Sequence, residues 1–137
     1  MTEPDFTWPV RVYWEDTDAG GVVYYANYLK FLERARTEWL RGLGIEQTEL
    51  AERDGVLFVV RRVEADYLRS ARFNDMLAVE CRLVAVGRAS MTIDQRVMRG
   101  DEALLTATVK AACVKADQFR PVKIPAHILE RFGKQWN

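Results

Sequence analysis

The fold is decided by the stretch Asp16-Thr17-Asp18-Ala19-Gly20-Gly21-Val22-Val23-Tyr24-Tyr25-Ala26-Asn27-Tyr28, which joins a strand-like run to the longest helical pattern in the chain. Gly20 and Gly21 can adopt positive φ, so the backbone there can turn sharply and approach a ligand closely. The first turn of the following helix carries N–H groups without partners inside the helix and a partial positive charge. A carboxylate facing such a helix start can act as base or nucleophile on a carbonyl, with the N–H groups as oxyanion hole.

The same stretch also has a purely structural interpretation. An acid followed by glycines near a helix start is usually a cap or a turn residue, and spacing alone favours that interpretation. Two details weaken it. Asp18 lies too far ahead of a helix that begins near Tyr24 to be a simple cap, and the intervening Gly-Gly-Val-Val is not the polar sequence of an ordinary surface turn. Asp18 is therefore the candidate catalytic residue.

Hydrophobic periodicity divides the first half of the chain into a strand and two helices. Residues Thr7–Glu15 alternate between apolar and polar side chains, which predicts a strand with one packed face. From about Tyr24 to Leu43 the apolar residues recur at three- and four-residue steps, which predicts a long, largely enclosed helix. The repeating positions are Leu29, Leu32, Ala35, Trp39, Leu40 and Leu43. Ile45–Asp54 reads as a short second helix that ends at Gly55.

The second half of the chain is predicted to be mostly strands. The expected strands are Val56–Leu68, Met76–Val86, Ala89–Met98 and Ala103–Ala116, and a short helix is expected at Ala126–Phe132. In the first of these strands, Val59, Val63, Ala65 and Tyr67 are predicted to share one face. Short turns join the later strands, which favours an antiparallel meander. The fold class is therefore α+β, with an antiparallel sheet wrapped around one principal helix.

The length of 137 residues is that of one domain, 1–137. Its apolar content of 49% is enough to fill a single core. The 20 basic and 20 acidic residues balance, whereas a general nucleic-acid binder has a basic excess. Cys81 and Cys113 lie in separate apolar runs, which predicts buried reduced thiols in a cytoplasmic protein rather than a disulfide framework or a zinc site. No run reaches the ~20 apolar residues of a membrane span, and the acidic segment 1–6 has no signal-peptide core.

Two segments of the chain resemble a known family. The segments Val12–Leu29 and Phe31-Leu32-Glu33-Arg34-Ala35-Arg36 closely resemble the hotdog-fold acyl-CoA thioesterases, in particular the YbgC-type enzymes associated with the Tol-Pal system. The related 4-hydroxybenzoyl-CoA thioesterase branch shares the core pattern, an Asp-x-Asp-x-x-Gly-x-Val followed by Asn-Tyr. The resemblance covers nearly the whole chain, because Phe58–Arg62 and Pro121–Pro125 also fit.

The resemblance implies a mechanism and a partner set. The family's catalytic carboxylate falls on Asp18, and its oxyanion donor, a backbone N–H, falls on Tyr25. Many YbgC-type members have histidine at the position of Tyr25, so a mechanism that needs an imidazole there does not transfer, whereas one that uses Asp18 and the backbone N–H does. The implied substrate is an acyl-CoA or acyl-carrier-protein thioester. No cofactor is implied, and the implied assembly is a homodimer with a continuous sheet, or a homotetramer, with sites at the subunit interface.

Five further residues are substrate-binding candidates. Gly20 and Gly21 would shape the loop around the thioester. Phe58 and Val59 are expected to line the acyl pocket beside the helix start, although ordinary core packing accounts for them equally well. Arg88 follows Gly87 in the turn where the resembling family holds CoA phosphates, a ligand that arginine suits.

Two residues of the loop are predicted to support the site rather than to react. Asp16 would orient the loop or bind a backbone N–H, and Asn27 would cap or brace the helix start. His127 is the single histidine of the chain and is expected at the surface, so a serine or cysteine triad and a metal site are both disfavoured.

Two rival functions remain from the sequence. A hydroxyacyl dehydratase on the same fold would favour a histidine in the active loop, and none is there. A non-catalytic acyl-thioester binder or Tol-Pal envelope accessory protein would gain little from an unpaired carboxylate beside a thioester, so Asp18 favours the thioesterase. Whether Asp18 is the nucleophile or the general base is left open.

Overall fold

The structure is a computed structural model that describes residues 3–133, so the outermost residues of the predicted domain 1–137 and of the acidic segment 1–6 lie outside it. The strands are β1 (Phe6–Arg11), β2 (Val56–Tyr67), β3 (Met76–Val86), β4 (Ser90–Arg99) and β5 (Glu102–Lys115). The helices are α1 (Asn27–Gly42), α2 (Gln47–Asp54) and α3 (Ala126–Arg131). All strand pairs are antiparallel, in the order β1-β3-β4-β5-β2. The predicted α+β class, the meander and the terminal helix are confirmed.

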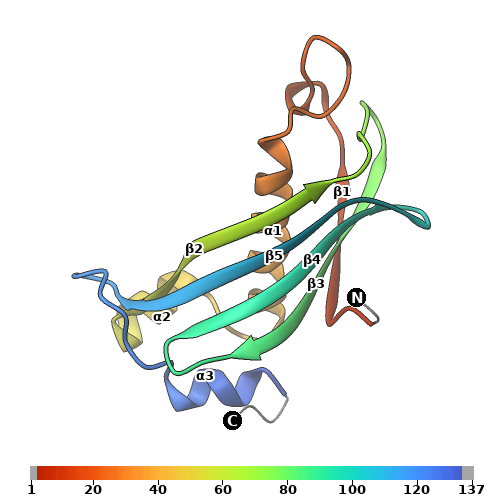
Figure 1. Cartoon of the computed structure of the whole chain (residues 1–137). Helices are drawn as coiled ribbons and strands as arrows, with labels where there is room; N and C mark the ends of the chain where they lie inside the picture. Colours follow the sequence, from red (N-terminus) through yellow and green to blue (C-terminus); the bar gives the residue numbers. More distant parts are fainter. Residues whose placement is uncertain (1–2, 134–137) are drawn as a thin grey trace.

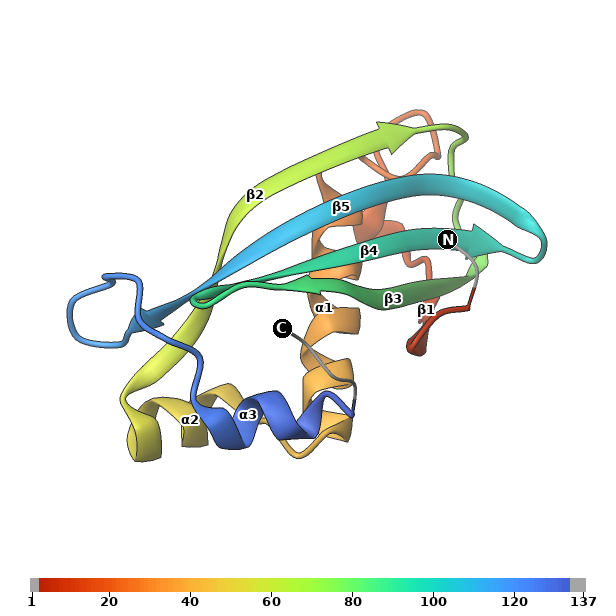
Figure 2. The same cartoon turned by 60° about the horizontal axis from the view of Figure 1, so that its bottom comes forward.

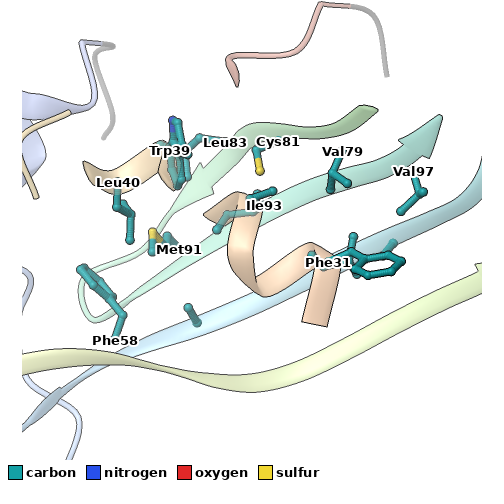
Figure 3. Close-up of a cluster of buried hydrophobic side chains, with 14 of the residues drawn as sticks. Phe31, Trp39, Leu40, Phe58, Val79, Cys81, Leu83, Met91, Ile93 and Val97 are labelled. Carbon is teal, nitrogen blue, oxygen red and sulfur yellow. The ribbon is translucent and has the colours of Figure 1, made fainter. Parts of the chain in front are cut away.

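Helix α1 crosses one face of the sheet, and the sheet curves around it (Figures 1 and 2). Its buried side chains are Tyr28, Phe31, Leu32, Ala35, Trp39 and Leu40. In Figure 3, Trp39 lies close to Leu83 of β3, and Phe31 lies toward Val97 of β4. The predicted apolar face was therefore correct for most positions. Leu29 is the exception, because its side chain is exposed near the start of the helix.

The three central strands bury alternate side chains against α1, as the period-two pattern predicts. Within β4 the buried positions are Met91, Ile93, Gln95 and Val97. Gln95 is thus a polar residue among the otherwise apolar side chains that β4 buries.

Strand β2 does not keep the single phase that the sequence predicts. The register with β5 shifts between Val60 and Arg62, so Arg61 is an extra residue in a β-bulge. Before the bulge Phe58 pairs with Cys113 and faces the core, and after it Val63 pairs with Val109. Val59 therefore does not share a face with the residues beyond the bulge. A one-residue insertion reverses the side-chain alternation, which explains the error.

The predicted first strand was too long at its C-terminal end. Pairing between β1 and β3 stops at Arg11, and residues Trp14–Asp16 form a turn of 3-10 helix. The Trp14 ring leaves the sheet and stacks on Phe73 with the ring centroids 3.8 Å apart. The chain therefore leaves the sheet earlier than predicted, and the longer connection forms the loop described below.

Both cysteines are free and buried, which confirms the prediction of reduced thiols. Burial raises the pKa of the Cys81 thiol to about 12 and that of Cys113 to about 11. Neither thiol is therefore ionised at neutral pH. None of the helices in residues 3–133 is long and apolar enough to cross a membrane.

Candidate active site

The stretch between β1 and α1 folds into a loop that pairs with itself. Thr17 and Val23 form an antiparallel bridge, the N–H of Asp18 donates to the Val22 carbonyl at 2.9 Å, and the N–H of Gly21 donates to the Asp18 carbonyl at 3.0 Å. We call residues 16–25 the active loop. Figure 1 shows it at the upper end of the molecule, where it leads directly into α1.

Asp18 stands at the exposed tip of the active loop. Its Oδ1 accepts a hydrogen bond from the N–H of Gly20 at 2.8 Å, the contact an aspartate makes in an ordinary turn. Its Oδ2 accepts none from residues 3–133. One oxygen therefore fixes the side chain, and the other is available to a water molecule or a carbonyl carbon.

The two glycines serve the loop in different ways. Gly21 has φ of +80°, which strains any side-chain-bearing residue. At Gly20 a Cβ would lie 3.2 Å from Asp18 Oδ1, so a side chain there would press on the carboxylate. Both glycines thus help to shape the loop that holds the Asp18 carboxylate, and their substrate-binding role stays a prediction.

The backbone N–H of Tyr25 is the predicted oxyanion donor. Tyr25 lies two residues before the start of α1, and within the described part of the chain its N–H donates to no acceptor. The Tyr25 ring is exposed and packs at a tilt on Tyr24, with the ring centroids 4.8 Å apart. An unpaired N–H at the positive end of a helix is suited to an incoming oxyanion.

Asp16 and Asn27 connect the loop to the helix. Asp16 Oδ2 accepts from the N–H of Tyr13 at 2.8 Å, and the Asp16 carbonyl accepts both from the N–H of Tyr24 at 3.0 Å and from Asn27 Nδ2 at 2.8 Å. Asn27 is the first residue of α1 and braces it, whereas the cap position is Ala26. The supporting roles of Asp16 and Asn27 in the reaction stay a prediction.

Tyr67, at the end of β2, belongs to this site although the sequence did not single it out. Its hydroxyl donates to the Tyr25 carbonyl at 3.1 Å, and its ring meets those of Tyr25 and Tyr28 edge to face. The Tyr28 hydroxyl in turn accepts from the N–H of Ala71 at 2.9 Å. Three aromatic residues thus tie the start of α1 to the β2–β3 connection. The only sequence signal was a tyrosine at a strand end.

The structure does not bring the other substrate-binding candidates beside Asp18 within one chain. Phe58 is nine positions from Tyr67 along β2, which at ~3.3 Å per residue is about 30 Å. Val59 lies next to it, and Arg88 is in the β3–β4 turn, where its carbonyl accepts from the N–H of Ile124. The first residues of β2 and the β3–β4 turn lie at the end of the sheet away from the active loop (Figure 1). The expected place of Phe58 and Val59 beside the helix start is not met within one chain, because β2 begins at the far end of α1 and only its last residue, Tyr67, reaches the helix start.

His127 lies on the surface, as predicted, and its Nε2 is 2.9 Å from Asp54 Oδ1. This contact joins α3 to α2, far from the active loop (Figure 2). Within residues 3–133, no three side chains of histidine, cysteine, aspartate or glutamate gather in a cluster that could hold a metal ion.

Comparisons with protein families, curated proteins and solved structures all find thioesterases. Residues 12–132 match the family described as the thioesterase-like superfamily. The chain is 46% identical to the acyl-CoA thioesterase YbgC of Haemophilus influenzae over 132 residues, which cover 96% of this chain and 97% of that one. It is 44% identical to the acyl-CoA thioester hydrolase YbgC of Escherichia coli O6:H1, over 93% and 95% of the two chains. A probable thioesterase from Bartonella henselae superposes with a TM-score of 0.83 at 36% identity, over 87% and 98% of the two chains.

Proposed function

The chain belongs to the thioesterase-like superfamily and has the hotdog fold, and from this premise we propose that it hydrolyses acyl-CoA thioesters to the free acid and the CoA thiol. It is an enzyme of the thioester hydrolase class. One observation carries the site assignment. A single loop holds a carboxylate with an available oxygen, at Asp18, and a helix-start N–H without an acceptor, at Tyr25.

Two routes use these groups. In the first, Asp18 Oδ2 attacks the thioester carbonyl, the thiolate leaves, and water opens the resulting mixed anhydride. In the second, Asp18 removes a proton from a water molecule that attacks the carbonyl directly. In both, the Tyr25 N–H stabilises the oxyanion of the tetrahedral intermediate. A burst of thiol release before the steady state would favour the first route.

The site is proposed to be completed by a second copy of the chain. Strand β2 is an edge of the sheet, and its exposed Val60 and Val63 invite pairing. An antiparallel pairing of two β2 strands centred near Arg62 would set Phe58 of one copy opposite Asp66 of the other, because both are four positions from 62. Phe58, Val59 and Arg88 of one copy would then approach the active loop of its partner.

Substitution of Val63 by aspartate tests this assembly. Val63 is 38% exposed in the single chain and would be buried by β2–β2 pairing. We expect Val63→Asp to shift the protein from dimer to monomer at micromolar concentration in light scattering, and kcat/KM to fall about tenfold or more because a charge must be buried without a partner.

The matched control is Met76→Asp, which adds the same charge at a side chain that is 48% exposed and outside the β2 edge. A Val63→Asp protein that keeps the size of the native protein would remove β2 pairing from the proposal.

The activity itself is tested by thiol release from acetyl-, butyryl-, palmitoyl- and benzoyl-CoA and from an acylated acyl carrier protein. The two cysteines of the enzyme are buried, so a thiol reagent will report the product. We expect turnover at least ~100-fold above the uncatalysed rate for one class of ester. Failure with every thioester, by a folded dimer, would favour the alternative of a non-catalytic acyl-thioester binder.

Tyr67→Phe tests whether Tyr67 positions the oxyanion donor. The ring contacts remain, but the bond to the Tyr25 carbonyl is lost, so the adjoining peptide can rotate. We expect kcat to fall about 3–30-fold with KM nearly unchanged, because the loss acts on the transition state. Tyr13→Phe, which also removes an exposed tyrosine hydroxyl, is the control. A change confined to thermal stability would mean that Tyr67 is only structural.

The free buried thiols support a cytoplasmic location as part of the proposal. The link to the Tol-Pal system comes from resemblance alone, and no contact in the structure adds to it.

A further inference from the structure

Arg36 is a mostly buried cation that is attracted by Glu33, three residues earlier on α1. It lies in the middle of α1, and its Nη1 donates to Gln95 Oε1 at 2.9 Å. Among residues 3–133 the guanidinium forms no ion pair. Its burial lowers the pKa of Arg36 from the usual value, although the group stays charged at neutral pH. Four of the five N–H donors of the guanidinium are left without a described acceptor.

Gln95 holds this guanidinium without neutralising it. The Gln95 side chain is 1% exposed, and its Nε2 donates to the Leu32 carbonyl at 3.1 Å and contacts Cys81 Sγ at 3.2 Å. These contacts fix the amide so that Oε1 faces Arg36. A carboxylate at position 95 would cancel the charge, but the chain has a neutral amide there. The guanidinium is therefore oriented by Gln95, and Glu33, which lines the same cavity, attracts it without forming an ion pair.

Arg36 lines a cavity of about 200 Å³ between α1 and β2. The apolar lining side chains include Leu40, Phe58, Met91, Ile93 and Ala111. In Figure 3, Phe58 lies near Leu40 and Met91, and all three line this cavity. Glu33 and Thr37 also line it, and Thr37 Oγ1 donates to Glu33 Oε1 at 3.2 Å. A water molecule occupies ~30 Å³ of liquid, so the cavity has room for only a short chain of atoms.

A mostly buried guanidinium with unused donors is costly unless an anion or several acceptors meet it, even in a cavity whose lining is only partly apolar. The observed acceptor, one amide oxygen, supplies a single contact. A carboxylate would match the fork of N–H donors with two oxygens. The apolar walls would at the same time accept the methylene groups of a short chain.

We propose that this cavity is an acyl subsite selective for short acyl groups that end in a carboxylate, and that Arg36 binds that carboxylate. The inference rests on the proposed function. It also rests on β2–β2 pairing, which would place Phe58 and this cavity of one copy near the active loop of the other. The free acid of such a group shares the same chemistry, so the experiment separates the two sources.

The test compares succinyl-CoA with butyryl-CoA, two four-carbon esters that differ in the terminal carboxylate, with spontaneous hydrolysis subtracted. The native enzyme is expected to favour succinyl-CoA in kcat/KM by about tenfold to a hundredfold. In Arg36→Met the ratio is expected to fall to about one or below, and Arg36→Lys should restore part of it. Gln95→Glu keeps the guanidinium but neutralises it, so the preference should also disappear.

The outcomes are distinct. A native ratio near one, or a ratio that Arg36→Met leaves unchanged, would overturn the proposal. If succinate binds in an Arg36-dependent way while the kcat/KM ratio of the two esters stays near one, the acyl subsite is overturned and the ligand is a free acid. If neither ester is hydrolysed, the other thioesters of the panel decide whether the proposed function itself fails. Arg36-dependent binding of succinate, measured by calorimetry, would then still support the carboxylate site, and its absence would overturn it. Thermal unfolding of each variant shows whether the fold is kept.

Discussion

Asp18→Asn is expected to lower kcat for acyl-CoA hydrolysis by about 10²–10⁴-fold, the range over which a positioned acid–base group acts. The amide keeps an oxygen that can accept from the N–H of Gly20, so the loop should keep its shape. It has neither the nucleophilicity nor the basicity of a carboxylate, and both proposed routes need one of these. The measurement is steady-state thiol release on the best ester of the panel, with circular dichroism as the check on folding.

The control for this substitution is Glu15→Gln, because Glu15 is an exposed acid of the neighbouring turn whose side chain makes no described hydrogen bond or ion pair. The expected rate of Glu15→Gln is within about twofold of the native rate, since an exposed charge has little effect at a distance in water. Equal rates for the native protein and Asp18→Asn would take Asp18 out of the mechanism and leave the loop with only its structural interpretation.

The local part of the site could be predicted because it is contiguous in sequence. Asp18, the glycines and Tyr25 lie within one loop, and the contacts of Asp16 with Asn27 span 11 residues. The alternation of the central strands and the helical period of α1 were visible for the same reason, since each depends on residues a few positions apart.

The remainder depends on contacts that no local pattern encodes. Tyr67 reaches Tyr25 across 42 residues, and Arg36 reaches Gln95 across 59. The bulge at Arg61 is equally hidden, because a row of valines and arginines offers two faces of similar character. Pairing with β5 decides which face turns inward.

Phe58 shows why a correct strand did not give a correct site. The strand was predicted within one residue of its observed end, but its direction relative to α1 is a tertiary property. Because β2 is antiparallel to β5 and Tyr67 meets the start of α1, Phe58 must lie near the far half of the helix. The proposed pairing with a second copy would bring it to an active loop.

Phe31→Ala is expected to destabilise the protein by about 3–5 kcal/mol, the usual effect of removing a buried phenylalanine. Phe31 is 0% exposed in the second turn of α1 and contacts the Tyr28 ring edge to face, with the centroids 6.1 Å apart. It packs between the helix and the sheet, where neighbouring strands cannot close a gap of that size. Because most domains have a total stability of only about 5–15 kcal/mol, the variant should be partly unfolded near physiological temperature.

Phe119→Ala is the control, because it removes a phenyl group from the surface and leaves no cavity in the core. Phe119 is 65% exposed, in the loop after β5, so Phe119→Ala should change the free energy of unfolding by less than about 0.5 kcal/mol. Both variants should be unfolded in urea, because an unchanged slope with a lower midpoint for Phe31→Ala would locate the loss in stability rather than in compactness of the unfolded chain. If the free energies of unfolding lost by the two variants differed by less than about 1 kcal/mol, the packing of α1 against the sheet would be contradicted. That close packing is the reason why removing the Phe31 ring should destabilise the protein.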